Sequence, residues 1–295
     1  MKPIYSIMFV VSLVLFGLSV IALAAFGLNF GVDFKGGSIL ELEFRQRPGI
    51  EELRSALASE IDQIEISPAG DHGYILRTHE LSEQQHQAVL GTVADKFPEA
   101  GLSEKQFSSV GPAIGQELRT RSLIAIAIVL VLILLYIAVA FRKLSGVLSL
   151  WNMNIAAVVG LLHDIVIPLG VFAILGRYYG VQISAIFVAA ILTILGYTVS
   201  DKVVIFDRVR ENILRGAKGP LGDIVHKSVM QTLVRSINNT LTVVLSSAAI
   251  FFFGGESIRY FALALMIGIF LGAYSSIFVA SPLLVWLTER RKVKI

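Results

Sequence analysis

Six long runs of apolar residues limit how this chain can fold more than any other feature of its sequence. Each run has at least the roughly 20 residues that a helix needs to cross a bilayer core of about 30 Å. Hydrophobic residues make up 55% of the 295 positions, more than a soluble domain of this length needs for its core. The sequence therefore predicts an α-helical polytopic membrane protein with runs at 4–28, about 120–141, 147–176, 181–207, 230–254 and 258–287.

The first run also resembles a secretory signal peptide, since Lys2 precedes it and small residues occur at Ala22 and Ala24. However, the run from Ile4 to Leu28 is about 25 residues long, whereas the apolar part of a signal peptide has about 7–15. We therefore assign residues 1–28 to a retained first transmembrane helix.

Basic residues gather on one side of the predicted membrane. The short loops on the opposite side contain only Arg177 and Arg259. Because Lys and Arg accumulate on the cytoplasmic side, both chain ends are predicted to be cytoplasmic, including the basic tail at 288–295. The residues that mark this side are Lys2, Arg142, Lys143, Arg208, Arg210, Arg215, Lys218, Lys227, Arg290, Arg291, Lys292 and Lys294.

Residues 29–119 form one long insert between the first two spans, with the composition of a soluble domain, and they are predicted to be extracytoplasmic. Alternating apolar residues predict strands, and a longer apolar period predicts helices. Ser82 is typical of a helix N-cap. The order strand, helix, strand, strand, helix, strand predicts a ferredoxin-like α+β domain. Its elements are expected at 38–44, 49–57, 64–66, 74–76, 82–97 and 106–110.

The sequence disfavours several classes of function. It has no cysteines, which excludes disulfides and thiolate metal ligands. His72, His79 and His86 do not form a metal-ligand pattern with acidic residues, and no hydrolase, metalloprotease or P-loop motif is present. The net charge of +3, without a basic groove lined by aromatic residues, makes nucleic acid a poor partner. We expect no enzyme activity, cofactor or metal.

Charged residues inside the predicted spans point most directly to function, because each costs about 2.5–3.5 kcal/mol near the middle of a span. Asp164 follows His163 in the third span, and Asp201 lies in the cytoplasmic half of the fourth. The fourth span runs inward and the fifth outward, so Asp201 and Arg235 are expected to meet at a similar depth. A neighbouring arginine favours the ionised aspartate, so separation of the two side chains is a means to load a proton.

The alternative interpretation is a static buried ion pair that fixes the register of two helices. The presence of Asp164 and His163 favours a functional role, because proton paths in membranes are built from such groups. We predict a proton path through Asp201 and Arg235, with Asp164 and His163 as further candidates.

Other polar and small residues of the spans are expected to support packing. Asn238 and Asn239 in the fifth span are predicted to give polar support. The stem of Lys202 is expected to extend to the cytoplasmic interface, because adjacent residues point about 100° apart on a helix. Gly268 and Gly272 form a GxxxG motif, which serves helix contact either within one chain or with a partner helix.

Several motifs occur in one order along the chain: GVDFKGG at 31–37, VGPAIGQEL at 110–118, His163-Asp164, the stretch 196–212, Arg235 with Asn238, and YSSI at 274–277. Together they resemble the SecF family, the smaller membrane subunits of bacterial SecDF protein-translocation complexes. The resemblance extends over essentially the whole chain.

This resemblance implies a six-span subunit of the resistance-nodulation-division group that pairs with the six spans of SecD in the bacterial plasma (inner) membrane. It also implies that the proton motive force assists protein secretion as preprotein emerges from the SecYEG channel. In that family the aspartate of the fourth span and the arginine of the fifth belong to the proton path, and they correspond to Asp201 and Arg235. The implied partners are SecD, SecYEG, YajC, the exported preprotein and membrane lipids.

The chain departs from the family pattern in two places. Relatives usually have Asn-Asp-Thr where this chain has Ser200-Asp201-Lys202, and Arg-Thr-Leu-Asn-Thr-Ser where it has residues 235–240. The lysine adds a charge beside the predicted path. Two rival functions are a proton-driven exporter of a lipid or small molecule from the same superfamily, and a static assembly subunit.

Overall fold

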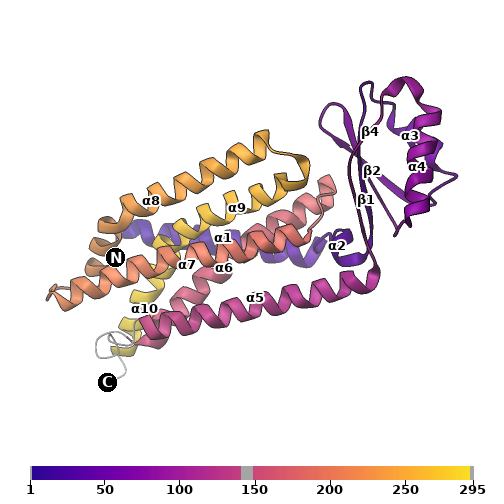
Figure 1. Ribbon diagram of the computed structural model, residues 1–295. Helices are drawn as coiled ribbons and strands as arrows, with labels where there is room; N and C mark the ends of the chain where they lie inside the picture. The colour runs from indigo at the N-terminus through magenta and orange to yellow at the C-terminus, as the bar shows by residue number, and fades with distance from the viewer. Residues whose placement is uncertain (1, 141–148, 293–295) are drawn as a thin grey trace. The chain divides into compact units, whose positions relative to one another are not determined.

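The chain folds into two units, which are described separately (Figure 1). The computed structural model describes residues 2–140 and 149–292. One unit is Phe30–Leu123, and the other contains the membrane-spanning helices. Arg142, Lys143 and Lys294, which contributed to the predicted orientation, lie outside the described residues, as do the predicted span ends at 141 and 147 and the end of the basic tail.

Six helices in the described part of the chain are long and apolar enough to cross a membrane, which confirms the predicted spans. The first five are α1 (Pro3–Phe26), α5 (Pro112–Ala140), α6 (Leu150–Tyr179), α7 (Ala185–Leu214) and α8 (Leu221–Phe253). The sixth consists of α9 (Glu256–Ser275), the short segment η3 (Ser276–Ala280) and α10 (Ser281–Lys292).

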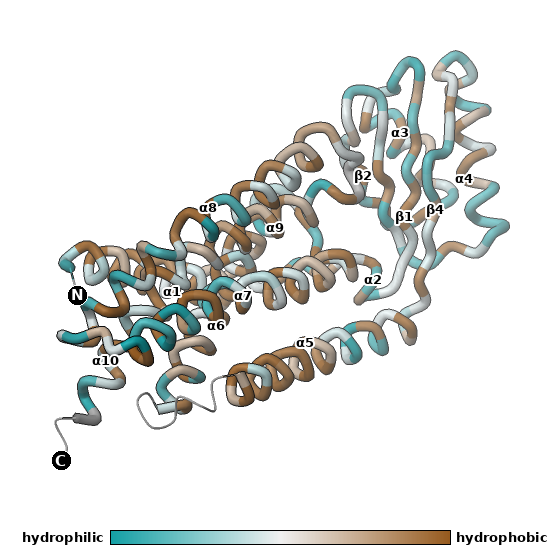
Figure 2. The backbone as a smooth tube through the Cα atoms, turned by 60° about the vertical axis from the view of Figure 1, so that its left-hand side comes forward, coloured by the Kyte–Doolittle hydropathy of each residue, from teal (hydrophilic) through white to brown (hydrophobic). Residues whose placement is uncertain are grey.

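Several helices extend beyond the apolar runs that predicted them. α5 begins at Pro112 rather than near residue 120, and α8 begins at Leu221 rather than near residue 230. Figure 2 shows this for α5, whose first turns are more hydrophilic than the strongly hydrophobic part that follows. The bilayer restricts the composition of the embedded part only, so backbone hydrogen bonding continues into the polar flank. Proline suits such a first turn, where its missing N–H would have no helical partner.

The last span changes its helical geometry part of the way along. The segment Ser276–Ala280 is π-helical, and α10 continues from Ser281. The Ser281 hydroxyl donates a hydrogen bond to the carbonyl oxygen of Ser276 at 2.7 Å. Single π-helical turns inside α-helices occur frequently at functional sites. This one directly follows Tyr274 and Ser275.

The Phe30–Leu123 unit contains a four-stranded sheet with two helices, as the sequence predicted. Its neighbouring strands are antiparallel, in the order β2-β3-β1-β4. The elements are β1 (Gly37–Glu43), α3 (Ile50–Leu57), β2 (Ile64–Ala69), β3 (Gly73–Thr78), α4 (Glu83–Lys96), the 3₁₀ turn η1 (Pro98–Ala100) and β4 (Ser103–Val110).

The core of this domain follows from the alternation of residues in β1. Leu40 and Leu42 are buried with Leu53 of α3 and Val89 of α4, so both helices cover one face of the sheet. Ser82 caps α4 as expected: its hydroxyl accepts a hydrogen bond from the Gln85 amide, and the Gln85 side chain accepts one from the Ser82 amide.

Two of the sequence motifs meet within the Phe30–Leu123 unit. The first contains α2 (Val32–Lys35), a single helical turn that the sequence analysis did not predict. Gly36 follows it with φ +83°, and a Cβ there would lie 2.8 Å from the Cα of Pro112 in the second motif. Gly115 is also tightly packed, since its Cβ would lie 3.1 Å from the Gly36 amide nitrogen. The glycines therefore allow the two motifs to pack backbone against backbone.

Candidate functional site

A cluster of charged and polar side chains lies buried where α6, α7 and α9 pack together. The Lys202 ammonium donates a hydrogen bond to Oδ2 of Asp164 at 2.6 Å. The other carboxylate oxygen, Oδ1, lies 3.2 Å from Nδ1 of His163. Ser275 of α9 lies beside the same carboxylate. Asp164 and Lys202 are both 0% exposed, so the pair is enclosed by protein.

The expectation for Lys202 was wrong. Its side chain does not extend to the cytoplasmic interface but turns towards α6, where it bonds Asp164 and lies 3.4 Å from the Thr198 carbonyl oxygen. The physical reason is that a buried carboxylate compensates the ammonium directly, whereas the sequence shows only the distance to the interface. An ion pair is the lower-cost arrangement for two charges within a span.

Asp201 faces a different neighbour from the one expected. It is 6% exposed, and Ser236 of α8 lies next to it. Among the described residues no ion pair joins Asp201 to Arg235. Adjacent helical positions point about 100° apart, so α8 presents Ser236 rather than Arg235 to Asp201. Similar depth was the basis of the expected pair, and depth does not fix the rotation of a helix about its axis.

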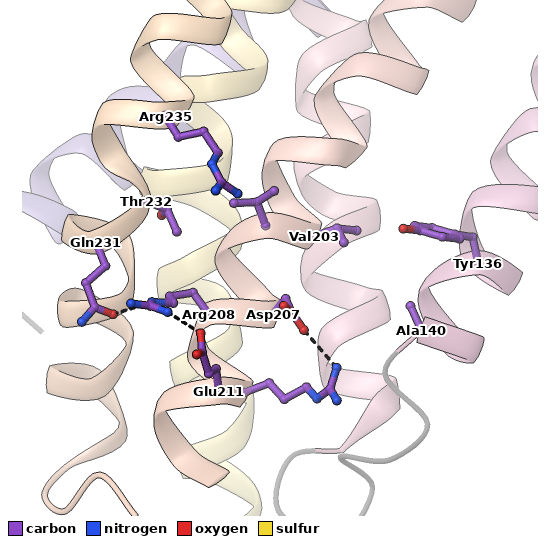
Figure 3. A pocket seen from close by; sticks show the side chains of 11 residues that line it. Tyr136, Ala140, Val203, Asp207, Arg208, Glu211, Gln231, Thr232 and Arg235 are labelled. Atoms are coloured by element: carbon purple, nitrogen blue, oxygen red, sulfur yellow. Dashed lines mark hydrogen bonds and ion pairs between the residues drawn. The ribbon is translucent and has the colours of Figure 1, made fainter. Parts of the chain in front are cut away.

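Arg235 instead points into a polar pocket between α7 and α8 (Figure 3). The pocket has a volume of about 560 Å³, and Val203 and Tyr136 contribute to its lining. Arg235 is an exposed residue, and within the described chain no hydrogen bond or ion pair engages its guanidinium group. Charged side chains within spans usually pair with a group of opposite charge. The Arg235 guanidinium group has no such acidic partner in the described chain.

Below Arg235 in Figure 3, charged side chains join α7 to α8 at the end of the pocket. Arg208 forms an ion pair with Glu211, and its Nε donates to Oε1 of Gln231 at 2.8 Å. Nη1 of Arg210 lies 3.0 Å from Oδ1 of Asp207. This network lies at the polar end of α7 that the sequence analysis assigned to the cytoplasmic interface.

The remaining predicted site residues fall into two groups. Asn238 and Asn239 are exposed on α8 and are not part of the buried cluster. Gly268 and Gly272 of α9 both face α7: a Cβ at 268 would lie 2.3 Å from Cδ1 of Ile194, and one at 272 would lie 2.0 Å from Cγ2 of Thr198. These glycines therefore serve helix contact within this chain.

The sequence analysis missed Gly160 of α6. A Cβ at this position would lie 2.5 Å from Cε of Lys202, so the missing side chain leaves room for the lysine stem. Glycine within an apolar run is common in membrane helices, and nothing in the sequence singles out this one.

A second hollow, of about 490 Å³, is almost entirely apolar and lies between α1, α8 and α9. Val229 and Phe270 contribute to its lining, and the Tyr5 hydroxyl lies 2.8 Å from Nδ1 of His226 at one end. Among the described residues, no three or more His, Cys, Asp or Glu side chains lie together in a way that could hold a metal ion.

Comparisons with known proteins place the chain among protein-export subunits. The family described as protein export membrane protein SecD/SecF, C-terminal, matches residues 92–290, and the SecD/SecF GG motif matches residues 21–46. A protein translocase subunit SecF from Thermobaculum terrenum is 41% identical over 276 residues, covering 90% of this chain and 86% of the relative. The chain belongs to the SecF family.

Longer SecDF proteins contain a part that is similar to this SecF-family chain. The crystal structure of SecDF from Thermus thermophilus, a translocon-associated membrane protein, matches with a TM-score of 0.83 and 32% identity, covering 97% of this chain but 38% of that chain. A protein translocase subunit SecDF from Brucella abortus is 36% identical over 281 residues, covering 91% of this chain and 35% of the relative. The SecF-family chain thus spans little more than a third of these SecDF chains.

Proposed function

We propose that this SecF-family subunit works with SecD as an auxiliary part of the Sec translocase, and that the proton motive force drives it to promote protein export. The relatives support the first part, because they are protein translocase subunits and because SecDF relatives join a SecF-like part to a longer chain. SecYEG and the exported preprotein are the further partners in this role, and YajC is an additional candidate. The proposed activity is transport, in agreement with a family that is described as protein export membrane proteins.

The proposed orientation places both chain ends in the cytoplasm and residues 29–119 outside, in the plasma membrane of a bacterium. It is supported by the six spans and by the basic residues near the ends of α7 and α8. In this orientation the outer domain lies on the side where an exported chain emerges.

The observation that carries the proton-driven mechanism is the state of Asp201. This carboxyl group lies inside α7, is 6% exposed and has no ion-pair partner among the described residues. Acidic groups placed in this way within spans are the groups that carry protons in pumps and transporters. A proton that crosses a potential of about 100 mV releases about 2.3 kcal/mol, which is enough to bias a movement between two states of a domain.

Arg235 has a complementary role in this proposal. Its exposed guanidinium group needs an acidic partner that the described chain does not supply, so we assign that partner to the spans of SecD. Docking of SecD would then enclose the pocket that Arg235 lines. Protonation of Asp201 on one side of α8 and pairing of Arg235 on the other would respond to the same movement of that helix.

The test is secretion into inverted membrane vesicles that contain the SecF-family chain with SecD and SecYEG. Asp201→Asn is expected to remove the stimulation that a proton gradient gives, while the amount of SecD that copurifies stays the same. Asp223→Asn is the matched control, because Asp223 is an exposed acid in the first turn of α8. Full stimulation in Asp201→Asn would overturn the proposal.

The apolar hollow between α1, α8 and α9 favours one alternative, the export of a lipid or small molecule, since such substrates bind in apolar cavities of about 300–1,000 Å³. Val229→Trp would fill part of this hollow. On the proposed function, the variant keeps its stimulation of protein secretion, whereas loss of transport of an apolar substrate with secretion unaffected would favour the exporter.

A further inference from the structure

The two polar atoms that contact the Lys202 ammonium group are both oxygens. Its Nζ lies 2.6 Å from a carboxylate oxygen of Asp164 and 3.4 Å from the carbonyl oxygen of Thr198. The Ser275 side chain lies beside the same carboxylate. Carboxylate, carbonyl and hydroxyl oxygens are the groups that replace the hydration shell of a small hard cation in proteins. The ammonium group therefore stands where such a cation would bind.

The fold makes specific room for this lysine. Gly160 lies one turn before Asp164 on α6, and a Cβ at Gly160 would approach Cε of Lys202 to 2.5 Å. A Cβ at Gly160 would require the flexible end of the Lys202 stem to shift. The stem therefore lies directly against the backbone of α6 at Gly160.

Lys202 and Asp201 are neighbours in the sequence, but their side chains contact different helices. Asp201 lies next to Ser236 of α8, whereas Lys202 bonds Asp164 of α6. The titratable groups around the ammonium are Asp164 and His163 from α6 and Asp201 from α7, and Tyr274 from α9 stacks against His163 with ring centroids 6.2 Å apart. Of the two buried acids, only Asp164 has a fixed positive partner in the described chain.

We propose that Lys202 is a tethered cation: it fills an oxygen-lined site at Asp164 that would otherwise take a free monovalent cation, and it leaves Asp201 as the acid that exchanges protons. The inference rests on the proposed function for the role of Asp201, but the closure of the site by Lys202 is a binding property that needs no secretion assay. Lys202 is thus a positioning residue that determines ion specificity, and Asp164 is removed from the proton path.

The experiment compares thermal unfolding of the full-length chain, purified with SecD, in sodium, potassium and choline chloride at equal ionic strength. The wild-type midpoint is expected to be the same in all three salts. Lys202→Thr opens the site, so its midpoint is expected to rise by about 2–4 °C in sodium or potassium relative to choline, as for a ligand at a few times its Kd. Lys202→Thr combined with Asp164→Asn removes the carboxylate and is expected to lose that difference.

A midpoint for Lys202→Thr that is identical in all three salts overturns the proposal. If this variant does not accumulate, Lys202→Gln provides the second test, because it removes the ammonium charge and keeps a stem of similar shape beside Gly160. A sodium or potassium response is expected there as well, and its absence also overturns the proposal. Neither salt response depends on Asp201. A failed salt response would therefore leave the secretion test of Asp201→Asn unaffected. A failed secretion test would likewise leave the salt response valid.

Discussion

Gly272 packs so closely on Thr198 that a Cβ at position 272 would lie 2.0 Å from Cγ2 of the threonine. The contact holds α9 against α7 one turn before Lys202, so the spacing of these helices and the position of the buried pair depend on each other. A side chain on Gly272 would have to move either the threonine or a helix.

Gly272→Ala is therefore expected to destabilise the membrane-spanning unit by about 1–3 kcal/mol, the usual cost of overpacking a core. Gly196→Ala on α7 is the matched control, because a Cβ there would meet nothing within 4 Å. Thermal unfolding in detergent measures both. Adding Thr198→Ala to Gly272→Ala should restore part of the loss, and equal midpoints for the two glycine variants would contradict the packing argument.

Gly36→Ala is expected to disturb the contact between the two sequence motifs of the Phe30–Leu123 unit. Gly70→Ala controls for backbone strain, since both glycines have positive φ, +83° and +59°, but only Gly36 is crowded, by Pro112. Limited proteolysis of the full-length chain should show faster cleavage near residues 31–37 in Gly36→Ala. Cleavage at the same rate in both variants would mean that the positive φ angle, and not the contact with Pro112, is the reason why glycine is needed at position 36.

Ser38→Ala tests a buried hydrogen-bonded link in the four-stranded sheet. The Ser38 hydroxyl accepts a hydrogen bond from the Leu81 amide at 2.9 Å and donates one to Ser109 at 2.8 Å. Its loss leaves a buried N–H without an acceptor, which costs about 1–3 kcal/mol. Hydrogen exchange should speed up at Leu81 more than in Ser103→Ala, a change at an exposed position of β4.

Arg235→Met is expected to remove proton-dependent stimulation, because it deletes the charge that the proposal pairs with SecD. Arg235→Lys separates charge from geometry, since lysine keeps the charge but loses the planar, bidentate guanidinium group. Secretion into vesicles and copurification of SecD measure both variants. Full activity in Arg235→Met would remove this residue from the mechanism, and full activity in Arg235→Lys would show that charge alone suffices.

Much of the fold could be predicted from the sequence because it depends on local pattern. Apolar runs of sufficient length indicate spans, and the alternation around Leu40 indicates a strand with one buried face. Ser82 marked the start of a helix correctly because capping is decided within three residues. The first turns of α5 and α8 were not predicted because polar residues there do not carry the apolar signal.

The sequence singled out three polar residues of the spans, but it predicted neither their pairings nor the place of Lys202 among them. Asp164, His163 and Asp201 stand out because charge within a span is costly. The partner of each depends on how the helices rotate about their axes, and that is set by close contacts such as Gly160 against Lys202, which the sequence does not reveal. For this reason Lys202, expected to reach the interface, lies at the centre of the cluster.

The π-helical segment Ser276–Ala280 gives the last span a spare residue just after the polar cluster. Each of its turns has one more residue than the α-helical turns on either side, so the segment can relax to α-geometry only if the chain beyond it rotates and advances. A change between π- and α-geometry in this segment would therefore rotate α10 relative to α9. The two ends of the last span can contact different neighbours, and a change beside Tyr274 can reach the C-terminal end of α10 without any break in the helix.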